Sequence, residues 1–175
     1  MKRIAIVCTI VLLAAAPAMA QDSSMTTSAK QTLGLIKTNI VKAADQMTEA
    51  NYAFKPTPEV RSFGQIVGHI ANANYMICST ASGAENPSKD VDIEKTKTTK
   101  ADLSKALAES FAFCEAQFDA MTAAKGMEMV DLFGMKMPRL NGLQFNTAHD
   151  FEHYGNLVTY MRLKGMVPPS SQRGM

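Results

Sequence analysis

The 175-residue sequence has very little net charge with which to bind a polyanion. It contains 18 Lys and Arg residues and 16 Asp and Glu residues, and two of the basic residues, Lys2 and Arg3, lie in a separate N-terminal segment. The rest of the chain is formally neutral and has no basic stripe. Nucleic-acid binding depends on neutralising phosphates with Lys and Arg. We therefore expect no nucleic-acid partner.

The sequence also lacks an apolar run of the roughly 20 residues that cross a bilayer. Its longest run, Ile4 to Ala16, follows two basic residues and precedes the small-x-small sequence Ala18-Met19-Ala20. This order is typical of a cleaved secretory signal peptide over residues 1–20. We expect cleavage after Ala20, a periplasmic or secreted location, no membrane contact after cleavage, and one domain over residues 21–175.

Four segments repeat apolar residues at spacings of three and four, which predicts four amphipathic helices in an all-α domain. Ser62 and Gln65 have the spacing of a capping box at the start of the second helix. Gly83 and Gly126 are expected to end the second and third helices. These lengths are typical of a four-helix bundle. The expected ranges are 28–51, 63–83, 100–124 and 141–164.

Two stretches do not have a helical pattern. Residues 84–98 are polar and are expected to form a long connection. Residues 126–140 alternate around Gly134, which predicts a short β-hairpin or paired extended strands. In an exported protein, the methionines of this stretch could instead bind copper. They are Met127, Met129, Met135 and Met137.

His149 and His153 are four residues apart, so they lie on one face of the fourth helix, where both rings could bind one metal ion. Together with Glu152 they also match the His-x-x-Glu-His motif of a class of zinc peptidases. That class needs a downstream carboxylate ligand, and the sequence contains no Asp or Glu after Glu152. We therefore reject the peptidase interpretation.

The remaining histidine, His69, lies in the second helix at the border of its apolar face. Three imidazoles can hold a divalent ion and leave a position open for water, and zinc and nickel are the metals that suit them best. Spacing alone leaves alternatives open. His69 could be a core-edge histidine bonded to a carbonyl group, and the other two could be ordinary polar residues. Asp150 and Glu152 could be solvated or could orient an imidazole.

Three stretches resemble the DinB-like superfamily, which includes DinB/YfiT-like metalloenzymes. They are SFGQIVGHIANANYMICS at 62–79, GLQFNTAHDFEHYGNLVTYMRLKGMVPP at 142–169 and the F-x-P-x-P-E-V-R turn at 54–61. The resemblance implies that His69, His149 and His153 are three metal ligands. It also implies a four-helix bundle with a long crossover between the second and third helices, which makes those two helices parallel neighbours.

The resemblance implies less about activity, because many relatives have no assigned reaction. Our hypothesis is a metal-dependent enzyme, a hydrolase or transferase, that acts on a small-molecule substrate. The alternative is a non-catalytic metal-binding or structural bundle. Some relatives use low-molecular-weight thiols, which are mainly cytosolic, so the predicted signal peptide argues against a thiol cosubstrate here. Tyr75, Asn146 and Tyr154 are candidates for lining the site. The sequence names neither the substrate nor the oligomeric state, and a homodimer stays open.

The two cysteines outside the N-terminal segment occupy matching positions in the second and third helices. Cys78 lies 16 residues after Ser62, and Cys114 lies 15 residues after Thr99, the expected cap of the third helix. In parallel helices these cysteines would differ in height by about 1.5 Å. Exported proteins commonly oxidise such pairs. We therefore predict a Cys78–Cys114 disulfide.

Overall fold

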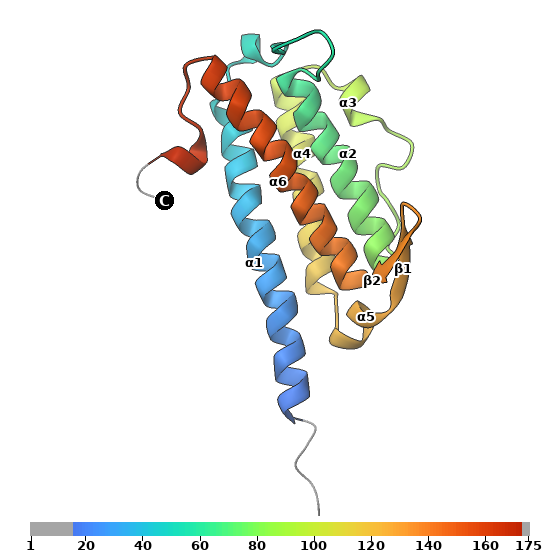
Figure 1. The fold of residues 1–175 in the computed structure, drawn as a ribbon. Helices are drawn as coiled ribbons and strands as arrows, with labels where there is room; N and C mark the ends of the chain where they lie inside the picture. Colours follow the sequence, from blue (N-terminus) through green and yellow to red (C-terminus); the bar gives the residue numbers. More distant parts are fainter. Residues whose placement is uncertain (1–15, 173–175) are drawn as a thin grey trace, which may run out of the picture.

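The computed structural model describes the backbone of residues 16–172 and the side chains of residues 25–172. Four long helices dominate it (Figure 1): α1 (Ala16–Gln46), α2 (Phe63–Ser82), α4 (Lys100–Asp119) and α6 (Arg139–Leu163). Short 3₁₀ helices (Glu49–Asn51 and Pro169–Ser171) follow α1 and α6. The predicted helical bundle is confirmed. In the described part of the chain, no helix combines the length and apolarity needed to span a bilayer.

The first helix is longer at its start than predicted. It was expected from residue 28, but α1 begins at Ala16, and residues 1–15 of the predicted signal peptide lie outside the described residues. The prediction was based on the periodic spacing of apolar residues. The start of α1 extends beyond the other three long helices (Figure 1), so it has no apolar face to bury and no such spacing. Pro17, the helix-breaking residue in this stretch, lies in the first turn, where its missing N–H costs no hydrogen bond.

Both predicted ends of α2 are confirmed. Ser62 Oγ accepts a hydrogen bond from the Gln65 backbone N–H, and Gln65 Oε1 accepts one from the Ser62 N–H, which completes the capping box. Gly83 ends the helix in the left-handed region, with φ of 75°. These local interactions set where His69 lies along the helix.

Helices α2 and α4 run in the same direction, as the crossover between them requires (Figure 1). Asn74 Nδ2 donates to Ser110 Oγ, and one turn further on Cys78 and Cys114 form the predicted disulfide, with Cα atoms 5.5 Å apart. Both pairs are 36 residues apart in sequence. This constant separation confirms the parallel register.

Two connections differ from the prediction. The third helix was expected to reach residue 124 and to end at Gly126, but α4 ends at Asp119 and Gly126 lies inside a separate short helix, α5 (Ala123–Met127). Thr122 Oγ1 accepts from the Lys125 N–H and so starts α5. The crossover contains a further short helix, α3 (Ile93–Thr96). Its one buried apolar residue, Ile93, produces no period that a sequence pattern could reveal.

The predicted hairpin is present, as strands β1 (Met129–Leu132) and β2 (Met135–Pro138). Met129 is paired with Pro138, whereas Met137 is paired with Val130. Met129 therefore lies on the opposite face of the hairpin from Met135 and Met137, because directly paired residues share a face. Met127 belongs to α5. The four methionines are therefore divided between two faces of the hairpin and a separate short helix, an arrangement that does not favour the copper alternative.

The core lies between the four long helices. It includes Leu33 and Ile36 of α1, Ile70 of α2 and Phe111 of α4, all fully buried. A smaller cluster packs the hairpin against the end of α2, through Ile77 and Leu132 among others. The core therefore holds α2 and α6 side by side, and these two helices carry all three histidines.

Candidate metal centre

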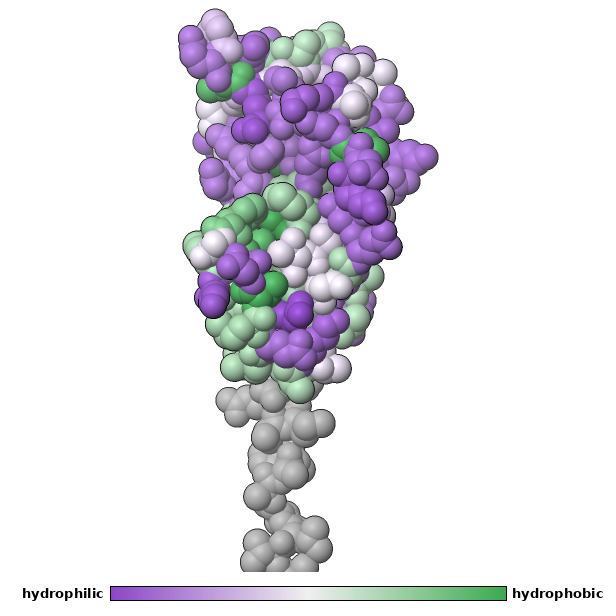
Figure 2. All heavy atoms as spheres, turned by 90° about the vertical axis from the view of Figure 1, so that its right-hand side faces the viewer, coloured by the Kyte–Doolittle hydropathy of each residue, from purple (hydrophilic) through white to green (hydrophobic). Residues whose placement is uncertain are grey.

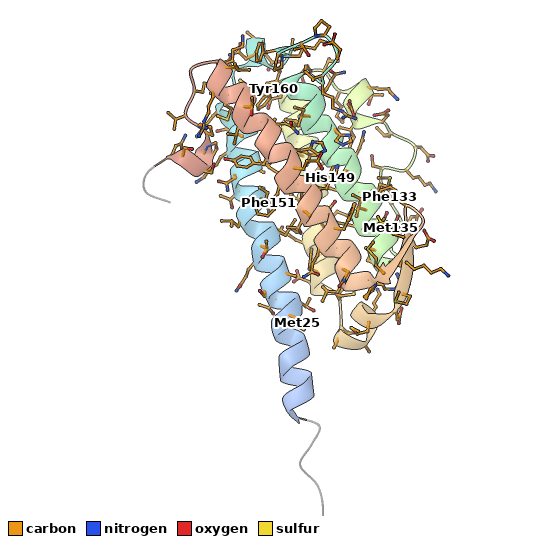
Figure 3. The ribbon with its side chains drawn as sticks, in the orientation of Figure 1. Met25, Phe133, Met135, His149, Phe151 and Tyr160 are labelled. Atoms are coloured by element: carbon orange, nitrogen blue, oxygen red, sulfur yellow. A yellow bond between two sulfur atoms is a disulfide. The ribbon has the colours of Figure 1, made fainter. Side chains whose placement is uncertain are left out.

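The three histidines converge at the junction of α2 and α6. His69 Nε2 lies 3.3 Å from His149 Nε2, and His153 Nε2 lies 3.0 Å from that same atom. All three residues offer a ring nitrogen within 4.8 Å of the others. Figure 3 labels His149, which lies where α6 passes α2. The structure thus brings together the three residues that the sequence singled out.

These distances suit a single metal ion. Two imidazole nitrogens bound to zinc at about 2.0–2.1 Å lie roughly 2.9 to 3.4 Å apart when the angle at the metal is between a right angle and the tetrahedral value. The two contacts of His149, at 3.0 and 3.3 Å, fall within that range. Three nitrogen lone pairs facing one another without an ion would repel. The donor set therefore fits a divalent metal.

Burial keeps the imidazoles neutral, which metal binding requires. It lowers the pKa of His69 and of His153 below the ordinary value of 6.5. The pKa of His149 falls to about 4, through burial first and through the neighbouring His153 second. At neutral pH the lone pairs are therefore free to bind a cation.

A carboxylate from the crossover holds the His69 ring in place. Glu94 of α3 places Oε2 3.3 Å from His69 Nδ1, and its Oε1 accepts a hydrogen bond of 2.9 Å from Arg61 Nε. With the Nδ1 hydrogen directed at this carboxylate, the Nε2 lone pair points into the cluster. Sequence reasoning missed Glu94, because α3 has no helical period of its own. It placed Arg61 only in the turn at 54–61 and did not link it to the site.

A neighbouring amide clamps the same segment to α2. Asn72 Oδ1 accepts from the Ile93 N–H and Asn72 Nδ2 donates to Asp92 Oδ1, both at 2.9 Å. On the other side of the cluster, the Asn156 amide lies 3.4 Å from His153 Nδ1. His149 Nδ1 has no hydrogen-bond partner within the described residues. The His69 and His153 rings are thus positioned by neighbours, while His149 depends on packing.

A cavity of about 650 Å³ opens beside His69 and His149. It lies between α2, the crossover and the hairpin. Figure 2 shows the side of the molecule that is on the right in Figure 1, and there apolar surface gathers around a hollow in the lower half. The other lining residues are Asn72, Ala73, Met76, Ile77, Asn86, Ser88–Asp92, Phe133 and Phe145. A small molecule in this cavity could reach two of the three rings.

The sequence profile of the DinB superfamily matches residues 35–157, which is more than half of the chain and includes all three histidines. The chain belongs to the DinB superfamily. The uncharacterized protein YjoA of Bacillus subtilis (strain 168) is 24% identical over 127 residues, which cover 70% of this chain and 79% of YjoA. The predicted family is therefore confirmed.

Solved DinB-like structures share the fold. A DinB-like protein of Bacillus cereus ATCC 10987 superposes with a TM-score of 0.69 at 18% identity, covering 79% of this chain and 92% of that one. The crystal structure of Bacillus subtilis YjoA gives 0.65 at 21% identity, covering 84% and 99%. At such identities the likeness concerns the fold alone.

Three residues expected to line the site of this DinB protein lie elsewhere. Tyr75 packs against Phe113 of α4, and Tyr154 accepts a hydrogen bond from the Ser170 N–H. Asn146 is buried between helices and donates to Asn74 Oδ1 at 2.7 Å. These expectations were wrong, because proximity along a helix does not determine the direction in which a side chain points.

Asp150, next to His149 in sequence, points into the core and not toward the cluster. It is fully buried, and its Oδ2 lies 3.3 Å from Asn146 Nδ2. Its Oδ1 and Asn146 Oδ1 have no hydrogen-bond partner within the described residues. Burial raises the pKa of Asp150 well above the ordinary 3.8. Burial therefore favours the neutral form of this carboxyl group, which belongs to the core and faces away from the three histidines.

Asp150→Asn is expected to raise the free energy of unfolding by about 1 kcal/mol or more at pH 7, because the amide oxygen still accepts from Asn146 Nδ2 and the amide has no charge to desolvate. A raised pKa means that the native carboxyl is stabilising below about pH 3.8, and that this stability is lost as pH rises toward the native pKa. The difference in unfolding free energy between Asp150→Asn and the wild type should therefore be small at pH 4 and should increase toward pH 7. Urea unfolding at several pH values measures it.

Glu152→Gln is the matched control, because it makes the same chemical change two residues away at an exposed position. The Glu152→Gln variant should not show a stability gain that grows from pH 4 to pH 7, because the exposed carboxylate is already solvated. Equal stability of Asp150→Asn and the wild type at pH 4 and pH 7 would contradict the buried, protonated carboxyl group.

Gly68 allows α3 to approach α2 beside the cluster. A Cβ atom at this position would lie 2.8 Å from the Glu94 Cα and 3.1 Å from the Glu94 backbone nitrogen. Gly68→Ala should therefore push Glu94 away from His69. We expect a loss of about 1–3 kcal/mol in stability and a roughly tenfold loss in metal affinity, measured by urea unfolding and competition with a chelator.

Gly34→Ala provides the control, because a Cβ atom at this position of α1 meets nothing within 4 Å. It should stabilise the helix by about 0.5–1 kcal/mol and leave metal affinity unchanged. If Gly68→Ala behaves in the same way, the close approach of α3 does not position Glu94.

Proposed function

We propose that His69, His149 and His153 bind one divalent metal ion, with zinc and nickel as the candidates that imidazole ligands favour. The observation that supports this most strongly is the convergence of three Nε2 atoms on one point, with contacts of 3.0 and 3.3 Å. Their lowered pKa values and the Glu94 contact to His69 Nδ1 support the same conclusion.

We further propose that the protein is a metal-dependent enzyme, a hydrolase or transferase acting on a small molecule. A bound ion with three protein ligands supplies Lewis acidity, lowering the pKa of a bound water and polarising a substrate oxygen. The chain contributes three neutral imidazoles, a carboxylate that orients His69, and the adjoining cavity. The cavity gives a substrate access to the rings of His69 and His149.

One observation favours the alternative, a non-catalytic metal-binding bundle. Glu94 is the carboxylate in contact with the cluster, and both of its oxygens are engaged, by Arg61 and by His69. Glu94 is therefore a positioning residue and a poor general base. Catalysis would then rely on the metal-bound water or on a group of the substrate.

The proposed location is the periplasm or the exterior of the cell. The leader-like residues 1–20 support export, and so does the Cys78–Cys114 disulfide, because such bonds persist in oxidising compartments. A soluble protein recovered from the periplasmic fraction with its N-terminus at Gln21 is the result that this proposal requires.

Elemental analysis of the protein purified from its native compartment tests the metal proposal. One equivalent of zinc or nickel per chain is expected. Hydrolase and thiol-independent transferase substrates are then screened with metal-loaded and metal-stripped protein. Activity that disappears with the metal and returns on its addition supports the enzyme, whereas full metal without metal-dependent activity favours the non-catalytic alternative.

A further inference from the structure

The cavity beside the histidines has two chemically different ends. Its polar end is formed by His69, His149 and Asn72. Further along α2 the helices and the hairpin present an apolar end, with Ala73, Met76, Ile77, Phe133 and Phe145. Residues 86 and 88–92 of the crossover also line the cavity and are mostly polar. A ligand that fills the cavity therefore meets ring nitrogens at one end and hydrocarbon at the other.

Two aromatic rings from different elements form the apolar end. Phe133 comes from the hairpin turn and Phe145 from α6, and their ring centroids lie 6.0 Å apart at an interplanar angle of 53°. Met76 of α2, itself 41% exposed, adds a polarisable sulfur. Tilted aromatic faces and a thioether favour a flat apolar group over a branched aliphatic one. Figure 3 shows Phe133 at the hairpin, beside the end of α2, and Phe133 is one of the residues that line the cavity.

The turn itself does not explain why residue 133 is Phe. Phe133 has φ of 56° and the following Gly134 has φ of 79°, so both central residues of this two-residue turn are left-handed. Such turns strongly favour Asn or Asp before Gly. Phe133 is the one described non-glycine residue with positive φ, and it is 58% exposed. A strained and exposed aromatic residue is typical of a ligand-contacting position.

We infer that this cavity binds a small molecule in which an aromatic or similarly flat apolar body adjoins the polar group that reaches the histidines, and that Phe133 determines this preference. Only the part of this inference that concerns the polar group of the ligand rests on the proposed function; the preference for an apolar body does not. A volume of about 650 Å³ is within the usual range of small-molecule sites, roughly 300–1,000 Å³. Phe133 is thus a specificity residue for the substrate body.

Three probes separate the two ends of the cavity. 2-Naphthohydroxamic acid carries a metal-chelating head and an aromatic body, acetohydroxamic acid carries the head alone, and 2-naphthamide carries the body alone. With zinc-loaded protein, calorimetry is expected to show 2-naphthohydroxamic acid binding at least tenfold more tightly than either of the other two.

Phe133→Ala should weaken 2-naphthohydroxamic acid and 2-naphthamide about tenfold while leaving acetohydroxamic acid unchanged. Phe133→Asn should do the same and should also raise the melting temperature by about 2–4 °C, because it suits the turn. A stability gain combined with a binding loss separates ligand contact from a merely structural role. Phe151→Ala is the control, because Phe151 is an exposed aromatic residue of α6 that does not line this cavity. It should leave the affinities for 2-naphthohydroxamic acid and 2-naphthamide unchanged.

Phe133→Trp should keep the affinity for 2-naphthamide and report it directly, because the sequence contains no other tryptophan. Its fluorescence should change on addition of the probe with the same dissociation constant that calorimetry gives.

The outcomes distinguish this inference from the metal proposal. If the protein binds no metal, the two naphthyl probes should bind equally and Phe133→Ala should weaken both, so that the cavity inference stands while the metal centre fails. If acetohydroxamic acid binds as tightly as 2-naphthohydroxamic acid, or if Phe133→Ala leaves both naphthyl probes unaffected, the inference is overturned. Failure of every probe to bind overturns it as well.

Discussion

Replacing His69, His149 or His153 by alanine is expected to reduce bound metal from one equivalent to less than about a tenth, because a three-ligand site loses most of its affinity with any one ligand. His69 provides the sharpest test, since it comes from α2 and lies 80 residues from His149 in sequence. Inductively coupled plasma mass spectrometry after gel filtration measures the content. The three variants should lose metal to a similar extent.

Glu152→Gln is the matched control for these variants. Glu152 lies between His149 and His153 in the sequence, but it is exposed and makes no hydrogen bond to either ring. The Glu152→Gln variant should therefore retain one full equivalent of metal. A His69→Ala protein that keeps stoichiometric metal, while His149→Ala and His153→Ala lose it, would remove α2 from the site and contradict the proposed centre.

The double variant Cys78→Ala/Cys114→Ala is expected to lose about 3–4 kcal/mol of stability, because the disulfide closes a segment of 36 residues and restricts the unfolded chain. This corresponds to a fall of roughly 10 °C in melting temperature. Both sulfur atoms are buried between α2 and α4, so the bond ties together the helix that carries His69 and its parallel neighbour. Differential scanning calorimetry measures the difference.

The wild type in excess dithiothreitol provides the control, because it lacks the bond but keeps both sulfur atoms. It should melt within a few degrees of the double variant, which separates the cross-link from the packing of the side chains. Thiol titration of the denatured, unreduced wild type should find neither cysteine free. Two titratable thiols in protein from the periplasmic fraction would rule out the bond.

Much of the bundle could be predicted because its signals are local. The capping box at Ser62 and the left-handed Gly83 set the limits of α2 through contacts within one turn. Equal offsets after two caps placed Cys78 and Cys114 at one height once the helices were taken as parallel. The hairpin followed from alternation around Gly134. Each inference needed only the neighbours of a residue and the geometry of its element.

The candidate site was predictable in part. The i,i+4 spacing put His149 and His153 on one helix face, and the family resemblance added His69. Glu94 was missed because α3 is four residues long and buries one apolar side chain, too little for a periodic pattern. Asn146 was misplaced because spacing does not define the rotation of α6 about its axis, and the structure turns this amide toward Asn74.

By itself, the sequence determined the helices, their caps, the cysteine register and the residue types that could bind a metal, because these depend on interactions within a few turns of chain. Only the tertiary structure decided that the three Nε2 atoms meet, that Glu94 supports His69, and that a cavity with Phe133 at its apolar end opens beside them. The contact between His69 and His149 alone joins residues 80 positions apart. Such contacts depend on how whole helices rotate and pack, which the energy of the entire core determines.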